Sequence, residues 1–254
     1  MRICFLFLGL LLILKQTNAQ QIDKRILVFS KTTKYYHESI PTGMKAIQQL
    51  GKQHHFAVDT STNATVFNED NLKKYAAIVL MSPGGDVLDT SQQADIERFI
   101  QAGGGYVGIH AATTMEYGWP WYGKLAGAVF DGHPQAQDGV VVVVDSLNPA
   151  TSHLPKHWKR FDEWYNFKNI LPDLHILLTV DESTYTGGKQ GEFHPVAWYH
   201  EFDGGRSFYT ALGHYHEAYS DPLFLQHILA GIQYAIGNNI TLNYSKSTTH
   251  RILK

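Results

Sequence analysis

The sequence predicts an α/β fold, a three-layer sandwich in which helices cover both faces of a mainly parallel central sheet. In the first half of the chain, apolar strand-like runs alternate with amphipathic helical stretches, the pattern of parallel strands joined by crossover helices. The run AIVLM at residues 77–81 is apolar throughout, as expected of a strand covered on both faces. The length of 254 residues suits one domain with one core.

The predicted elements of the first half follow one another closely. Strands are expected at residues 25–29, 56–59, 77–81 and 106–109, and helices at 41–52, 68–75 and from Thr90 to the glycines at 103–105. The third helix has Thr90 as its expected N-cap, with Gln93 three residues on, and the glycines end it. In such sheets, function gathers in the loops at the carboxyl ends of the strands.

The second half of the chain is less regular. Strands are expected at residues 139–145, 176–180, 196–200 and 207–210, with a closing helix at 222–236. An aromatic-rich stretch, residues 158–167, lies between the first two of these strands. Residues 238–254 form a polar C-terminal tail whose last part, 245–254, is expected to fray.

The first 19 residues have the pattern of a secretory signal peptide. Arg2 precedes an apolar run at residues 3–14, and Ala19 supplies the small residue before the cleavage point. The run is shorter than the roughly 20 residues of a membrane span, although a retained N-terminal anchor is the alternative. We therefore expect cleavage after Ala19, a periplasmic or secreted protein, and no membrane insertion after cleavage.

Composition excludes several classes of function. The only cysteine, Cys4, lies in the predicted signal peptide, so the mature protein would have neither a disulfide nor a thiol nucleophile. The net charge of −2, without a cluster of Lys or Arg, argues against a nucleic-acid partner. The unusual feature is the presence of 14 histidines.

Three of the histidines follow predicted strands directly or closely. His37 follows the first strand, His110 the fourth, and His214 the last, so a parallel sheet would bring them together at one edge. His110 also occupies the central position of the turn GIHAA, residues 108–112, which has the shape of a nucleophile elbow. With histidine in place of Ser or Cys, an acyl-enzyme mechanism is poorly supported, and a base, acid or metal ligand is favoured.

Two further histidines and one carboxylate complete the candidate group. His133 and His194 each precede a proline, which restricts the backbone at the imidazole and pre-orients it; the alternative is an ordinary turn residue. Glu163 stands among aromatic rings, where its pKa could be raised or where it could bind a metal. A surface acid beside core aromatics is the alternative for Glu163.

These residue types suit a divalent metal such as zinc, and we predict no nucleotide cofactor. The candidate metal ligands are His110, His133, His194 and His214. The candidate catalytic residues are His110, His214 and Glu163. Aromatic rings with polar handles suit the apolar faces and hydroxyls of sugars. The candidate substrate-binding residues are His37, Glu38, Trp121, Trp164, Trp198 and Arg206.

Five segments in this order resemble the ThuA-like family. They are YYHESI at 35–40, GIHAATT at 108–114, GAVFDGHP at 127–134, DEWYNF at 162–167 and HPVAWYHEFDGGRSFYTALGH at 194–214. The resemblance covers residues 25–237 and implies a class I glutamine amidotransferase-like, flavodoxin-like fold with elaborated loops and no elbow cysteine. Where relatives often end the second segment with an acid, this chain has Thr114, which leaves Glu116 as the nearest acid that could orient His110.

The resemblance implies carbohydrate metabolism, with a name taken from trehalose utilisation and an association with 3-keto sugars. The first hypothesis is a periplasmic hydrolase or lyase acting on glycosides or disaccharides, including 3-keto glycosides, and working beside a sugar oxidoreductase. It is not a glutamine amidotransferase. The second hypothesis is a non-catalytic sugar-binding module on a scaffold that lost its nucleophilic cysteine, because fold does not determine function.

Overall fold

The computed structural model describes residues 24–238 and 241–252. The predicted signal peptide, residues 1–19, lies outside the described part of the chain. A nine-stranded sheet in the order β2-β1-β3-β4-β11-β10-β9-β6-β7 forms the middle layer. Its strands are β1 Lys24–Phe29, β2 Phe56–Ser61, β3 Ala77–Met81, β4 Gly105–Ile109, β6 Gln137–Val143, β7 His157–Asp162, β9 His175–Asp181, β10 His194–Phe202 and β11 Gly205–Thr210.

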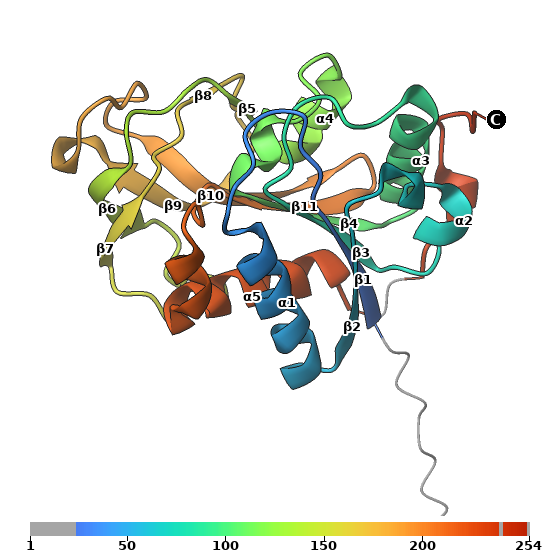
Figure 1. Ribbon diagram of the computed structural model, residues 1–254, viewed down its shortest axis with the longest axis horizontal. Coiled ribbons are helices and arrows are strands. Elements are labelled where there is room, and N and C mark those ends of the chain that lie inside the picture. Colours follow the sequence, from blue (N-terminus) through green and yellow to red (C-terminus); the bar gives the residue numbers. More distant parts are fainter. Residues whose placement is uncertain (1–23, 239–240, 253–254) are drawn as a thin grey trace, which may run out of the picture.

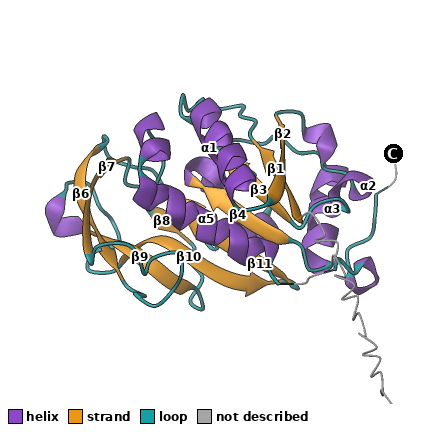
Figure 2. Cartoon of the chain, turned by 90° about the horizontal axis from the view of Figure 1, so that it is seen from below, coloured by secondary structure: helices purple, strands orange, loops and turns teal. Residues whose placement is uncertain are grey.

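Helices cover both faces of this sheet, which confirms the predicted three-layer α/β fold. In Figure 1, α1 and α5 lie on one face, and α3 and α4 lie on the other. The view from below in Figure 2 shows α1 and α5 crossing the sheet. The helices are α1 Ile40–Gln53, α2 Glu69–Leu72, α3 Thr90–Gln101, α4 Pro120–Ala126 and α5 Pro222–Ile236, and a small second sheet pairs β5 Val129–Phe130 with β8 Phe167–Lys168.

Strand direction decides where the loops meet. Strands β1 to β4 and β11 are joined by parallel pairs, whereas β10, β9, β6 and β7 are joined by antiparallel pairs. Following these pairs across the sheet, only β6 and β10 of its nine strands run against the rest. The carboxyl ends of β1, β4, β7 and β11 therefore lie at the same edge of a mixed, mostly parallel sheet.

The start of α3 differs by one residue from the prediction. Asp89, not Thr90, is the N-cap, and its carboxylate accepts hydrogen bonds from the backbone N–H groups of Ser91 and Gln92. The side chain of Gln92 accepts a hydrogen bond from the N–H of Asp89 in return. This reciprocal pair is a capping box, in which a carboxylate replaces the expected hydroxyl.

The sequence did not predict β7, because charged residues occupy positions that proved to be buried. Along HWKRFD the inward-facing side chains are Trp158, Arg160 and Asp162, so the period of two is present. Two of these three positions carry a charge, which obscures the alternation of apolar and polar residues that marks a half-buried strand. Arg160 and Asp162 lie 3.8 Å apart, and Arg160 also pairs with Asp221 at 2.8 Å, so neither charge is buried alone.

Residues 248–249 of the C-terminal tail are attached to α3, contrary to the expectation that this part of the chain frays. The side chain of Gln101 accepts hydrogen bonds from the N–H groups of Thr248 and Thr249. Arg98 donates to the carbonyl of Thr249 at 2.7 Å.

Within residues 24–238 and 241–252, no helix is long and apolar enough to cross a bilayer.

Candidate active site

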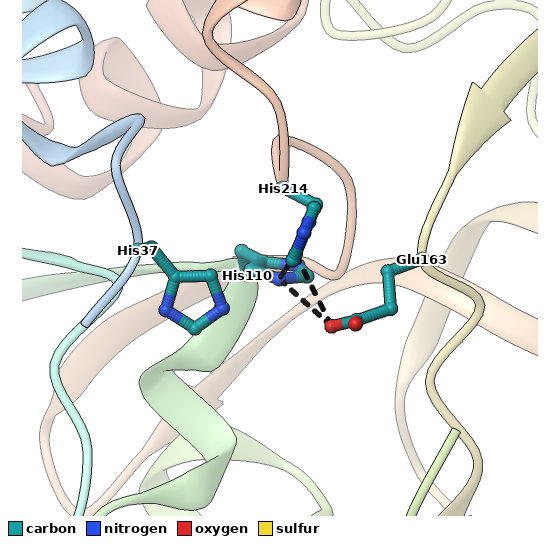
Figure 3. Close-up of side chains that lie close together, drawn as sticks. All are labelled: His37, His110, Glu163 and His214. Carbon is teal, nitrogen blue, oxygen red and sulfur yellow. Dashed lines mark hydrogen bonds and ion pairs between the residues drawn. The ribbon is translucent and has the colours of Figure 1, made fainter. Parts of the chain in front are cut away.

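Four side chains from distant parts of the sequence meet at the carboxyl edge of the sheet. His37 follows β1, His110 follows β4, Glu163 follows β7, and His214 follows β11. One ligand atom from each of the four lies within 4.8 Å of the others, and Figure 3 shows the four side chains pointing toward one another. The predicted convergence of the three histidines is confirmed, and Glu163 joins them.

His110 occupies a strained turn with a defined tautomer. Its φ of 49° lies in the left-handed region, as expected of an elbow residue between strand and helix. The hydroxyl of Tyr209 donates to the carbonyl of His110 at 2.8 Å. Nδ1 lies 2.7 Å from the carbonyl oxygen of Ala211. Because a carbonyl can only accept, Nδ1 carries a proton, and in the neutral ring Nε2 therefore presents a lone pair.

This lone pair faces two other ligand atoms. The Nε2 of His110 lies 3.1 Å from the Nδ1 of His214 and 3.5 Å from the Oε2 of Glu163. The Nδ1 of His214 lies 3.2 Å from the same carboxylate oxygen. Ligand atoms bound about 2.0–2.1 Å from one zinc ion at tetrahedral angles lie about 3.3–3.4 Å apart. The triangle therefore has the dimensions of a metal's ligand shell.

His37 supplies the fourth side chain. It is buried, and its Nδ1 has no hydrogen-bond partner among the described residues, which is uncommon for a buried polar atom. Burial, followed by the charges of His110 and His214, lowers the pKa of His37 to about 3. A neutral imidazole with an unpartnered nitrogen is the form that binds a metal.

Glu163 is ionised, contrary to the possibility that its aromatic surroundings raise its pKa. Burial favours the neutral acid, but the hydrogen bonds and charges of His110 and His214 outweigh it and hold the pKa well below its usual range. The other carboxylate oxygen lies 3.1 Å from the Nδ1 of His133. That nitrogen is also 2.8 Å from the carbonyl of Pro134, so it carries a proton and donates. His133 thus contacts the group through Glu163.

Asp162 positions two of the four side chains, and the sequence analysis missed this role. Its buried carboxylate accepts hydrogen bonds from the backbone N–H groups of Glu163, Gly213 and His214, at 3.0–3.1 Å. It therefore ties the end of β7 to the loop after β11. The available sequence signal was its place directly before Glu163, whereas its inward position became evident only with β7.

A cavity of about 430 Å³ opens on the cluster, within the range of small-molecule sites. Its walls include Lys34, Tyr35, Thr114, Tyr117, Phe130, His133 and Tyr165. The ring of Tyr165 packs on His110 with centroids 4.4 Å apart. Tyr35 and Tyr117 were not among the expected contacts, because their convergence depends on loop conformations that no local pattern indicates.

Several expected residues lie outside this group. Both ring nitrogens of His194 are engaged: Nε2 lies 2.8 Å from the carbonyl of Tyr165, and Nδ1 lies close to Glu182 and Tyr185. Glu116 does not contact His110; its carboxylate accepts hydrogen bonds from the loop at residues 87–88. The orientation of His110 comes from the carbonyl of Ala211 instead.

The expected sugar-binding residues other than His37 are also not gathered there. Trp164 and Trp198 are core side chains whose indole N–H groups donate to backbone carbonyls. Trp121 donates to Asp203, and Arg206 donates to carbonyls at the end of α5, beyond the opposite edge of the sheet. Glu38 is exposed. Core packing therefore accounts for two of the three tryptophans that were expected to bind the substrate.

The fold and the buried cluster define an α/β protein that carries a histidine at its elbow and a potential metal site at the carboxyl edge of its sheet. The family model described as "Trehalose utilisation", ThuA, matches residues 25–235. The chain therefore belongs to the ThuA family. The family description suggests a role in carbohydrate metabolism.

Solved structures share this fold. A ThuA-like protein of Bacteroides uniformis is 22% identical with a TM-score of 0.73, over 87% of this chain and 95% of that one. A ThuA-like protein of Parabacteroides merdae is 20% identical with a TM-score of 0.70, over 87% and 92%. A β-galactosidase of Rahnella sp. R3 is 14% identical with a TM-score of 0.52, over 82% of this chain and 30% of that one. No curated protein matches the chain.

Proposed function

We propose that this ThuA family member is a metal-dependent hydrolase or lyase that acts on glycosides, with 3-keto glycosides as the favoured class. The observation that carries the proposal is the triangle of His110, His214 and Glu163 atoms with edges of 3.1–3.5 Å. The family's description supports a carbohydrate substrate. A purely sugar-binding role gives no reason to bury three imidazoles and a carboxylate together.

The side chains present fit a divalent transition metal such as zinc. His110, His214 and Glu163 would hold it, with the unpartnered His37 beside them; imidazole and carboxylate are accepted ligands for zinc. When bound, such an ion polarises a carbonyl or hydroxyl oxygen of the substrate. The strained turn at His110 and the hydrogen bonds of Asp162 fix the ligand positions before the ion arrives.

His133 is suited to act as the base that removes a proton from the substrate. Its Nδ1 proton is directed to Glu163 and Pro134, so in the neutral ring the lone pair is on Nε2, and the ring lines the cavity. In a 3-keto glycoside, a base removes the proton at C2, next to the carbonyl, and the electron pair forms an enolate. The enolate then expels the glycosidic oxygen from C1, and this oxygen takes up the proton that His133 removed from C2. Addition of water to the resulting enone completes hydrolysis.

The proposal also concerns the source of the substrate and the location of the protein. A 3-keto glycoside forms when the C3 hydroxyl of a glycoside is oxidised, so a sugar oxidoreductase would have to supply it. The apolar run at residues 3–14, with Arg2 before it and Ala19 after it, supports a periplasmic or secreted location.

The test is turnover of matched 3-keto and ordinary glycosides, measured by mass spectrometry of the released products. The zinc-loaded protein is expected to cleave the 3-keto glycoside, and Glu163→Gln is expected to reduce the rate at least about 10²-fold. Glu217→Gln, which alters an exposed acid paired with His216, serves as the control with wild-type rates. Binding of the sugar without any turnover would show the binding module instead.

A further inference from the structure

A second, larger cavity adjoins the cavity at the cluster. It has a volume of about 720 Å³, and the side chains of Tyr117 and Phe130 line both cavities. Tyr117 is half exposed and Phe130 is partly buried. A molecule bound at the cluster that is too long for the first cavity therefore meets the second one across these two rings.

The walls of the second cavity come from outside the central sheet. Helix α4 and the turn before it form one wall, and the two-stranded sheet β5–β8 forms the other. Figure 1 shows α4, β5 and β8 together on the same face of the molecule. Because loops and short added elements carry specificity in folds of this class, this location suits recognition of the part of a substrate that does not react.

The second cavity has an apolar floor and a polar rim. Met115 and Tyr122 are buried at its floor, and the one buried acid in the lining, Glu116, already accepts hydrogen bonds from the N–H groups of residues 87–88. Lys124, Lys168 and Asn169 are exposed at its rim, where they can hydrogen-bond hydroxyl groups. An apolar surface bounded by donors and acceptors matches a sugar ring, which has apolar C–H faces and a hydroxyl-bearing edge.

We infer that the second cavity binds a second sugar unit of an extended glycoside whose reacting unit lies at the cluster, so that the substrate is a disaccharide or longer. This inference rests on the proposed function for the reacting unit. Two lysines, Lys124 and Lys168, and two acids, Glu116 and Asp131, line the cavity. Lys168 pairs with Asp131 at 3.5 Å, so the charges of the lining balance. That balance favours a neutral hydroxylated unit over an anionic one.

Gly123 offers a way to fill this cavity without touching the cluster. It lies in α4 and lines the cavity. Apart from its two chain neighbours and the helix's own backbone, a Cβ at this position would meet Val129 Cγ2 at 3.1 Å and no other described atom within 4 Å. Gly123→Leu would place an isobutyl group in the cavity. Gly123→Ala is the matched control, because it makes the same change in helix propensity but adds one carbon.

The kinetic test compares a 3-keto disaccharide with a 3-keto sugar that carries only a methyl aglycone. Gly123→Leu is expected to raise KM for the disaccharide about tenfold or more, with kcat/KM for the methyl glycoside within about twofold of wild type. Gly123→Ala should resemble wild type with both. An equal loss with both substrates, or no loss with either, would overturn the inference. If replacing the methyl aglycone by a phenyl aglycone lowers KM as much as the second sugar does, the second cavity is an apolar site and not a sugar site.

A binding measurement separates this inference from the proposed chemistry. Calorimetric titration of unoxidised disaccharide and monosaccharide into the zinc-loaded protein requires no turnover. If no glycoside is cleaved but the disaccharide binds wild type and Gly123→Ala at least about tenfold more tightly than Gly123→Leu, the second cavity is a sugar site and only the chemistry fails. Equal affinity of the three proteins for the disaccharide would show that the cavity does not hold the second unit.

Discussion

At the scale of single residues, the cluster depends on side chains that hold others in place. Nε2 of His110 points toward the cluster because Nδ1 of the same ring donates to the carbonyl of Ala211. The backbone N–H groups of Glu163 and His214 both donate to the carboxylate of Asp162, which fixes where these two side chains leave the chain. Partners of metal ligands set orientation and basicity, and their loss typically weakens metal binding about 10–100-fold. The positions of the candidate metal ligands therefore depend on the residues that hydrogen-bond to them, above all Asp162 and Ala211.

Asp162→Asn tests whether the hydrogen bonds of Asp162 position the metal ligands. The amide would present N–H groups to backbone N–H groups, so at least one of the three hydrogen bonds is lost, while Arg160 keeps its partner Asp221. We expect the affinity of metal-free protein for zinc to fall about 10–100-fold, as measured by competition with a chelator of known affinity.

The matched control for that variant is Asp181→Asn. Asp181 also accepts a backbone N–H, from Ser183, but lies at the end of β9, and its zinc affinity should equal that of wild type. Unchanged affinity in Asp162→Asn, with Asp181→Asn as reference, would show that Asp162 does not position the ligands.

At the scale of elements, β7 brings the carboxylate to the histidines. It is one of the two edge strands of the sheet, and its direction follows from two antiparallel pairings, β9 with β6 and β6 with β7. Had β6 paired in parallel with β9, Glu163 would leave β7 at the opposite edge. The position of the acid is thus a property of strand order and not of any motif around it.

The N-terminus of α3 gives a quantitative test at the same scale. Asp89→Ala removes the carboxylate that accepts the N–H groups of Ser91 and Gln92. We expect a loss of about 1 kcal/mol in the free energy of unfolding, the usual effect of losing an N-cap, measured by urea denaturation.

Thr90→Ala is the control, because Thr90 is exposed and lies inside the first turn. It should change the free energy of unfolding by less than about 0.5 kcal/mol. A larger effect for Thr90→Ala than for Asp89→Ala would place the cap at the residue that the sequence pattern favoured.

At the scale of the whole molecule, the sequence predicted what depends on periodicity and chain order. Alternating strands and helices indicated a parallel sheet, and strand ends indicated that His37, His110 and His214 meet. The buried pair of Arg160 and Asp162 was not predictable in this way, because a charged residue is compatible with burial only when its partner is known. For the same reason, local pattern did not distinguish Trp198 in the core from a wall of the cavity.

The central claim is that this arrangement binds one divalent transition metal ion. The most direct measurement is the metal content per chain, by inductively coupled plasma mass spectrometry, of protein lacking residues 1–19 and purified without chelator. His110→Ala is measured beside it, and His157→Ala, an exposed histidine at the other end of β7, is the control. We predict close to one zinc or similar ion per chain in wild type and His157→Ala, and little in His110→Ala. Metal-free wild type that also takes up no zinc, or equal metal in His110→Ala, would contradict the account.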